Sequence, residues 1–133
     1  MADTVAEPAL VFVYGLLMRG HELHHHMESG EFVGEGRVDG VLISLGRYPG
    51  LIEGPGTVRG ELYRFADLPS ALDVLDDVEE FEPTDPSRSL YLRIAMRAKT
   101  DDGDVDAWVY RYNGPTEGAQ LIRSGDWSTA SKS

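Results

Sequence analysis

The sequence predicts a mostly β member of the α+β class: a small mixed β-barrel with about two α-helices. Short apolar or alternating runs are separated by glycine-containing turns, which is typical of small barrels because short, bent strands close on themselves readily. Residues 68–80 break this pattern with a helical periodicity. The chain has 133 residues, which is enough for one hydrophobic core, so we expect a single domain.

Five segments have the composition of β-strands. Residues 9–14 form a continuous apolar run, as expected of a strand that is buried on both faces. Residues 32–45 are extended but interrupted by glycines, which suits a bent or bulged strand of a barrel. A third strand is expected at residues 58–65. Residues 90–99 and 105–112 flank an Asp-Asp-Gly turn and therefore predict an antiparallel hairpin.

Two segments are expected to be helical, a short one at residues 21–27 and an amphipathic one at residues 68–80. The sequences Tyr48-Pro49-Gly50 and Gly54-Pro55-Gly56 are turn signals. Residues 82–89 are rich in Pro, Asp and Ser and predict a surface loop. Together these elements place most of the chain in one β-rich unit.

Composition limits the classes of partner. The chain has 12 basic and 23 acidic residues and a formal net charge of −11, which disfavours nucleic acids and anionic membranes because both attract basic surfaces. It contains no cysteine, which excludes a disulfide framework, a thiolate nucleophile and a Cys-ligated metal. The sequence carries no signal for oligomeric state.

The ends of the chain suggest no targeting segment. The N-terminus has no basic region followed by an apolar one, so we expect no signal peptide. No apolar run approaches the length of about 18–20 residues that spans a bilayer. We therefore expect a cytoplasmic protein with polar tails at residues 1–8 and about 128–133.

Glu79 is the most informative single residue. At about 100° per residue, it falls on the apolar side of the predicted helix, between Leu72 and Leu75. The apolar arc contains Leu68, Ala71, Leu72, Val74, Leu75 and Val78, and the opposite, solvated arc contains Asp73, Asp76, Asp77 and Glu80.

A carboxylate against a hydrophobic core is costly unless it is paired, hydrogen-bonded or protonated. Such burial raises the pKa of a glutamate from about 4.3 toward the range of about 6–7 that suits a general acid or base. The alternative is that Glu79 bends out to water or pairs with Arg93 or Arg97. The periodicity alone does not separate the two.

A second candidate is a metal site in the pattern His21-Glu22-Leu23-His24-His25. It matches the His-Glu-x-x-His sequence of zinc proteases, in which two histidines one helical turn apart bind zinc and the glutamate activates water. That helix is normally long and apolar, whereas Gly20 and Gly30 leave room here for only a short one. We therefore expect no metal site.

A third candidate is the junction between the first strand and the loop after it. The sequence Tyr14-Gly15-Leu16-Leu17 follows a buried strand and opens toward a predicted helix. Consecutive backbone N–H groups at such a junction can bind a carboxylate or a phosphate. On its own this signal is weak, because many strand-to-helix turns use glycine.

At this junction the chain resembles the gamma-glutamylcyclotransferase-like family, which has the avirulence-induced-protein-like cyclotransferase fold. The family opens with a strand, Tyr-Gly-Ser/Thr-Leu, often Arg-Gly, and then a His-His pair. The similarity runs in order over nearly the whole chain, through Tyr14–Gly20, His24-His25, Tyr48–Leu51, Val58–Tyr63, Leu75–Glu79, Tyr91-x-Arg93, Ala107–Tyr110 and Ser124–Trp127.

The resemblance implies a site and a reaction. Glu79 would be the catalytic glutamate, Tyr14, Gly15, Leu16, Leu17 and Tyr91 would bind the substrate, and no metal or cofactor would be needed. The α-amine of a γ-glutamyl group would attack its own γ-carbonyl and release an amine and 5-oxoproline. Two positions depart from the family pattern, Leu16 in place of Ser or Thr and Glu80 in place of a frequent Gly.

Two alternatives to this reaction remain. The same barrel could serve as a non-catalytic module that binds a small molecule, in which case Leu16 marks the loss of the reaction. The least favoured alternative is a zinc-dependent hydrolase that uses His21 and His25.

Overall fold

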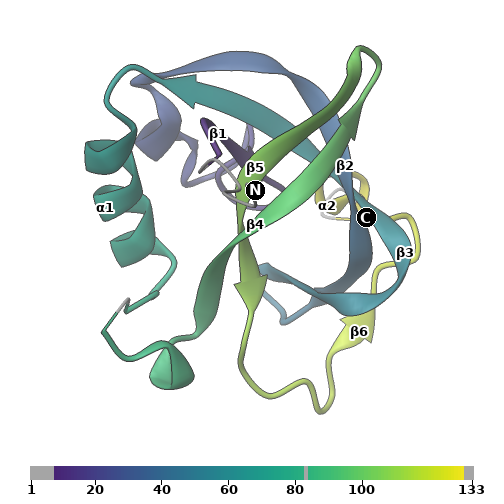
Figure 1. The fold of residues 1–133 in the computed structure, drawn as a ribbon. Helices are drawn as coiled ribbons and strands as arrows, with labels where there is room; N and C mark the ends of the chain where they lie inside the picture. The colour runs from purple at the N-terminus through teal and green to yellow at the C-terminus, as the bar shows by residue number, and fades with distance from the viewer. Residues whose placement is uncertain (1–7, 83, 131–133) are drawn as a thin grey trace, which may run out of the picture.

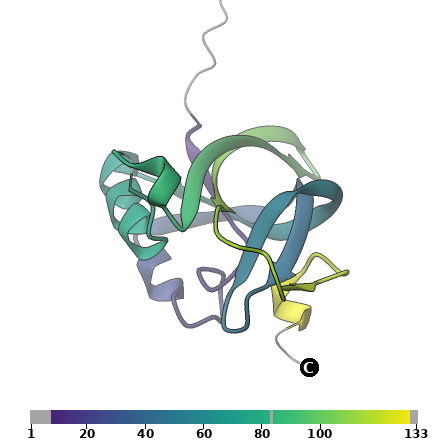
Figure 2. The same ribbon diagram turned by 90° about the horizontal axis from the view of Figure 1, so that it is seen from below.

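A closed ring of strands forms the body of the protein. The computed structural model describes residues 8–82 and 84–130. In ring order, β3 pairs with β1, β1 with β5, β5 with β4, β4 with β2, and β2 again with β3, and the short β6 adds to β2 outside the ring. Figure 2 shows this ring, with the helix α1 packed outside it. The strands are β1 (Leu10–Val13), β2 (Gly30–Ser44), β3 (Pro49–Phe65), β4 (Tyr91–Thr100), β5 (Gly103–Tyr112) and β6 (Gln120–Leu121).

The predicted fold class is confirmed: the chain is α+β and mostly β (Figure 1). The sheet is mixed because β1 runs parallel to β5, whereas the other pairs are antiparallel. All four residues of β1 are buried, which explains its uninterrupted apolar sequence. The predicted hairpin of β4 and β5 is also confirmed, with register from Tyr91↔Tyr112 to Thr100↔Gly103.

The expectation for β3 was wrong at its start. This strand begins at Pro49 rather than at residue 58, and the chain reverses just before it, where Leu45 N–H donates to the carbonyl of Tyr48 at 2.9 Å. The segment Gly54-Pro55-Gly56 does not reverse the chain. It lies in a bulge, because the register with β2 jumps from Asp39↔Thr57 to Val41↔Ile52.

The first predicted helix was also wrong. Residues 21–27 form no α-helix, and only a 3-10 helix, η1 (His24–Met27), is present. Its hydrogen bonds span three residues, as in His24 N–H to the carbonyl of His21 and His26 N–H to the carbonyl of Leu23, both at 3.1 Å.

The second predicted helix is α1 (Leu68–Val78). Its N-cap is Asp67, whose Oδ1 accepts a hydrogen bond from the Ser70 N–H at 3.3 Å. At its other end Glu80 has a φ of +55°, and the N–H groups of Glu80 and Phe81 donate to the carbonyls of Asp77 and Asp76 at 3.2 and 2.8 Å. This pattern is a Schellman motif, in which the residue in the left-handed conformation is usually glycine.

The predicted buried face of α1 was partly wrong. Val74 was placed on the apolar arc, yet it is 49% exposed, and Asp76 was placed on the solvated arc, yet it is only 7% exposed. Asp76 can be buried because Arg93 and Tyr110 donate hydrogen bonds to it. The helix therefore presents Leu72, Leu75 and Asp76 to the barrel.

The end of the described chain packs back onto the barrel through α2 (Trp127–Ala130), in which Trp127 is 6% exposed. The carbonyl of Gly125 accepts from the Arg59 N–H at 2.7 Å. Of the expected polar tails, residues 1–7 and 131–133 lie outside the described part of the chain. No helix in the described part is both long and apolar enough to cross a membrane.

Candidate active site

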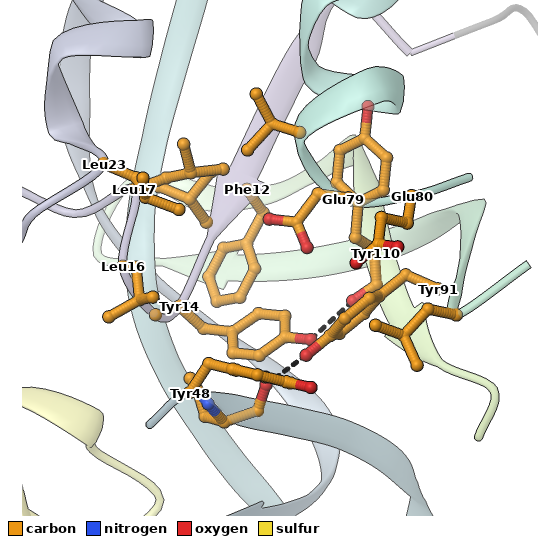
Figure 3. A pocket seen from close by; sticks show the side chains of 15 residues that line it. Phe12, Tyr14, Leu16, Leu17, Leu23, Tyr48, Glu79, Glu80, Tyr91 and Tyr110 are labelled. Carbon is orange, nitrogen blue, oxygen red and sulfur yellow. Dashed lines mark hydrogen bonds between the residues drawn. The ribbon is translucent and has the colours of Figure 1, made fainter. Parts of the chain in front are cut away.

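A pocket opens between the end of α1, the loop after β1 and the starts of β3 and β4 (Figure 3). It brings together every residue that the sequence singled out for the reaction. Its lining residues are Phe12, Val13, Tyr14, Gly15, Leu16, Leu17, Leu23, Tyr48, Pro49, Val78, Glu79, Glu80, Leu90, Tyr91 and Tyr110. The only charged side chains among them are those of Glu79 and Glu80.

The loop after β1 is held tightly against the barrel. A Cβ atom at Gly15 would lie 2.7 Å from Cγ of Pro49, so this position requires glycine. The loop turns between Gly15 and Met18, whose N–H donates to the carbonyl of Gly15 at 3.1 Å. A turn closed in this way does not use the N–H groups of its two central residues, Leu16 and Leu17.

The carbonyl groups of the same loop already have hydrogen-bonding partners. The Leu23 N–H donates to the carbonyl of Leu16 at 3.0 Å, and Nδ1 of His24 lies 2.9 Å from the carbonyl oxygen of Leu17. The His24 ring thus has a structural partner in this loop. With its carbonyls engaged, the loop offers N–H groups as its remaining polar atoms.

Tyr14 and Tyr91 line the pocket, but their hydroxyl groups already have partners. The Tyr14 hydroxyl donates to the carbonyl of Tyr110 at 2.6 Å and accepts from the Leu51 N–H at 3.1 Å. The Tyr91 hydroxyl donates to the carbonyl of Pro49 at 2.7 Å. Burial raises the pKa of both Tyr14 and Tyr91 above the ordinary value, so these phenols stay protonated and bind the barrel strands together (Figure 3).

Glu79 follows the last turn of α1 as its C-cap, and its carboxylate points into the pocket toward Phe12 and Tyr14 (Figure 3). Among the described residues, none donates a hydrogen bond to this carboxylate or forms an ion pair with it. Burial, and to a smaller extent the negative charge of Glu80, raise the pKa of Glu79 from 4.5 to about 7. A group with this pKa exchanges protons readily at neutral pH.

Neither arginine that the sequence offered as a partner for Glu79 binds it. Arg93 instead pairs with Asp76. Its Nε donates to Oδ1 at 2.8 Å, and its Nη2 donates to Oδ2 at 3.2 Å. The Tyr110 hydroxyl donates to the same Asp76 Oδ1 at 2.7 Å. Arg97 pairs with Asp106 on the neighbouring strand, at 3.1 Å.

The buried role of Asp76 was not predicted from the sequence. The only signal for it was that Asp76 lies three residues before Glu79, which places the two side chains close together on the surface of a helix.

A second buried carboxylate, Glu61 on β3, was also missed. It is 9% exposed, and it accepts hydrogen bonds from the Arg19 N–H, the Arg19 Nε and the Tyr63 hydroxyl at 3.0, 3.1 and 2.9 Å. The Arg19 guanidinium also lies 3.8 Å from the ring centre of Phe32. These contacts tie the far end of the pocket loop to the barrel. No periodicity in the sequence indicated a buried acid at this position.

The histidines of the zinc-protease pattern are not arranged as that pattern requires. His21 and His25 do not share an α-helix, since only the 3-10 helix from His24 forms here. Nε2 of His21 lies 2.9 Å from Oγ of Ser128, and the rings of His25 and His26 are 4.1 Å apart. Within residues 8–82 and 84–130, no group of three or more His, Cys, Asp or Glu side chains could hold a metal ion.

Known proteins share both the sequence and the fold. Residues 11–129 match the family described as "Gamma-glutamyl cyclotransferase, AIG2-like". The chain is 36% identical over 118 residues to the gamma-glutamylcyclotransferase family protein YtfP of Escherichia coli (strain K12), covering 88% of this chain and 94% of that protein. The solution structure of ytfP from Escherichia coli superposes with a TM-score of 0.65 at 35% identity, covering 92% of this chain and 98% of that one.

Two further relatives widen this group. The crystal structure of an AIG2-like protein from Mus musculus has a TM-score of 0.66 at 29% identity, covering 83% of this chain and 81% of that one. The gamma-L-glutamyl-butirosin B gamma-glutamyl cyclotransferase of Niallia circulans is 30% identical over 105 residues, covering 77% of this chain and 66% of that protein.

Proposed function

The chain belongs to the AIG2-like gamma-glutamyl cyclotransferase family, and from that premise we propose that it releases 5-oxoproline from a γ-glutamyl amine. The observation that carries this proposal is the carboxylate of Glu79, which has no partner in the described part of the chain and points into the pocket with a pKa of about 7. The reaction needs one group that first accepts a proton and then returns it. A glutamate with this pKa serves both steps at neutral pH.

In the proposed reaction Glu79 accepts a proton from the substrate's α-ammonium group. The freed amine attacks the γ-carbonyl carbon, a new carbon–nitrogen bond closes the five-membered ring, and the bond to the leaving amine breaks. Glu79 then donates its proton to the leaving nitrogen. The ring nitrogen loses its second extra proton to Glu79, which passes it to the departing amine, so that the amine leaves as an ammonium ion and the enzyme returns to its starting state. Atoms and charges balance without a redox partner, a water molecule or a nucleotide.

The loop after β1 has the polar groups that the rest of the substrate needs. A γ-glutamyl group carries an α-carboxylate, yet no Lys, Arg or His side chain of residues 8–82 and 84–130 lines the pocket. Backbone N–H groups must therefore bind this carboxylate or the oxyanion that develops on the γ-carbonyl, and the amides of Leu16 and Leu17 are suited to this. The apolar walls exclude water and favour the folded conformer that cyclisation requires.

The test is an assay for 5-oxoproline release from a panel of γ-glutamyl derivatives of amino acids, peptides, simple alkylamines and the lysine ε-amine. We expect release from at least one of these substrates by the purified wild-type protein. Release should be lost in Glu79→Gln and kept in Asp77→Asn, which makes the same change at an exposed position of the same helix. Equal loss in both variants, or no release from any substrate, would reject the proposal.

Leu16 supports a second candidate function, a module that binds γ-glutamyl compounds without turnover. Its side chain lines the pocket where the family resemblance leads us to expect Ser or Thr, and the change would narrow the site and remove one hydrogen-bonding group. Losing such a partner costs about 1–3 kcal/mol, so we expect Leu16→Ser to bind a γ-glutamyl amide about tenfold more tightly or to turn it over faster.

NMR titration of the Tyr14–Leu17 amides with a γ-glutamyl amide measures this binding directly. Shifts in both proteins, with turnover only in Leu16→Ser, would support the binding module for the natural chain. If these amides do not move in either protein, the loop is a structural turn and neither function stands.

A further inference from the structure

The strongest unexplained feature is the ion pair beneath the last turn of α1. Asp76 is 7% exposed and the Arg93 side chain 18%, and two hydrogen bonds of 2.8 and 3.2 Å join them. Neither residue lines the pocket, whereas Tyr110, the third member of this group, does. Burying such a pair is costly unless its geometry is good, and stability alone does not require it, because apolar residues of similar volume could fill the same space.

The pair is well placed to control Glu79. Asp76 lies three residues before Glu79 in the helical turn, and positions i and i+3 lie on the same side of a helix. The carbonyl of Asp76 also accepts the Phe81 N–H at 2.8 Å, which closes the motif that ends the helix and sets the direction in which the chain leaves it. Both the side chain and the backbone of Asp76 therefore fix the turn from which Glu79 enters the pocket.

Arg93 is the cation of this group, and its charge, like those of Asp76 and Glu79, acts on the hydroxyl of Tyr110, which lines the pocket. Its guanidinium lies 4.7 Å from the ring centre of Trp108 and 5.7 Å from that of Phe81, outside the pocket, and Asp76 holds it there with two parallel hydrogen bonds. An Arg–carboxylate pair of this kind is neutral as a unit and has a fixed orientation. We infer that Asp76 is a positioning residue, which retains Arg93 outside the pocket and leaves Glu79 without a cationic partner.

This inference rests on the proposed function, since it assigns Asp76 a role through the general acid and base Glu79. The other titratable or charged groups that line the pocket with Glu79 come from five elements or their ends. They are Glu80 after α1, Tyr14 after β1, Tyr48 before β3, Tyr91 on β4 and Tyr110 on β5. None of them is cationic, so a change in the balance between Asp76 and Arg93 should change the electrostatic potential at Glu79.

The test compares the two variants Asp76→Asn and Asp76→Asn/Arg93→Gln with the wild type. Asp76→Asn keeps the shape of the side chain but gives the group a net charge of +1, which favours the ionised form of Glu79. We expect the acidic limb of the kcat/KM profile to move down by about 0.5–1 pH unit. The double variant is neutral again, and its acidic limb should return to the wild-type position.

Titration of the Glu79 carboxyl carbon by NMR provides a second readout that needs no turnover. The pKa of Glu79 measured in this way should fall in Asp76→Asn and return to the wild-type value in the double variant. Asp77→Asn is the matched control, because it removes an exposed carboxylate from the same helix. It should change the pKa of Glu79 much less, because solvent and salt screen the charge of Asp77.

A purely structural role for Asp76 makes a different prediction. Activity would fall in Asp76→Asn and fall further in the double variant, with the acidic limb and the Glu79 titration unchanged in both, and that result would overturn the inference. If no protein releases 5-oxoproline while the NMR titrations shift as expected, the proposed function fails and the control of Glu79 by Asp76 stands.

Discussion

Two glutamates of the barrel have opposite surroundings. Glu61 on β3 accepts three hydrogen bonds, two of them from Arg19, and thereby fastens one end of the loop after β1. Glu79 after α1 has no hydrogen bond or ion pair among the described residues, although burial raises its pKa to about 7. One carboxylate is fully used by the fold, and the other is left available to a ligand.

The difference shows how the protein separates stability from reactivity. Arg19 pairs with Glu61 and Arg93 pairs with Asp76, so neither arginine is paired with Glu79. Paired buried charges stabilise a local arrangement, whereas an unpaired one is costly and is typical of functional sites. Substitutions that treat the two glutamates alike should therefore give unlike results.

The largest expected effect is on turnover. Glu79→Gln removes the proton acceptor without changing the shape of the side chain, so kcat should fall by about 10²–10⁴ for any substrate that the wild type cyclises. Glu61→Gln should retain most of its kcat and change KM, because Glu61 touches the loop and not the reacting atoms. Steady-state kinetics of both variants measure the contrast, and a larger loss of kcat in Glu61→Gln would reverse the assignment.

The same two substitutions should change stability in opposite directions. Glu61→Gln places an amide nitrogen opposite the donors of Arg19 and should lower the free energy of unfolding by about 1–3 kcal/mol. Glu79→Gln removes a buried charge and should raise it by about 1–3 kcal/mol at pH 8. Denaturant unfolding at pH 8 measures both changes, and destabilisation by both variants would show that Glu79 has a partner in the fold.

The stability gain in Glu79→Gln should also depend on pH with a defined sign. The pKa of Glu79 is raised from 4.5 to about 7 in the folded protein, so between these values the folded state binds more protons than the unfolded state. Wild-type stability should therefore fall as pH rises from 4.5 to 7, relative to Glu79→Gln, and the difference between the two should vanish below pH 4.5. A difference that is constant across this range would contradict the raised pKa.

The kinetic counterpart of that pKa is the acidic limb of the activity profile. Glu79 must be ionised to accept a proton, so kcat/KM should rise with pH through about 7 and level off above it. Measurements between pH 5 and 9 with one γ-glutamyl amide locate this limb. A limb near pH 4.5, the ordinary value for a glutamate, would show that burial does not control the group.

The smallest expected effect concerns Glu80, which has a φ of +55° where glycine is the usual residue. Glu80→Gly should relieve backbone strain and stabilise the protein by up to about 1 kcal/mol, after the added flexibility of the unfolded chain is subtracted. It should also lower the pKa of Glu79, because the charge of Glu80 contributes to raising it. Glu80→Gln separates the two effects, since it removes the charge and keeps the strain.

Some of the site was predictable from local sequence alone. The apolar run of β1, the glycine that follows it and the helical periodicity before Glu79 are short-range signals. The family resemblance, and not these signals, predicted that Gly15 and Glu79 belong to one site, and both residues line the pocket. The short-range signals failed where side-chain partners lie far along the chain. Asp76 meets Arg93 and Tyr110 across 17 and 34 residues, so its burial could not be read from the helix itself.

The sequence by itself determined the fold class, the hairpin of β4 and β5, the helix α1 and the glutamate that ends it, because propensity, periodicity and turn residues act over a few neighbours. The tertiary structure decided which acids are paired. Closure of the barrel brings Arg19 to Glu61 across 42 residues and Arg93 to Asp76, and it leaves Glu79 facing an apolar wall. Such pairs form only when strands that are distant in the sequence come together. The pKa of a carboxylate depends on its burial and its charged partners, so it is set only in the folded protein.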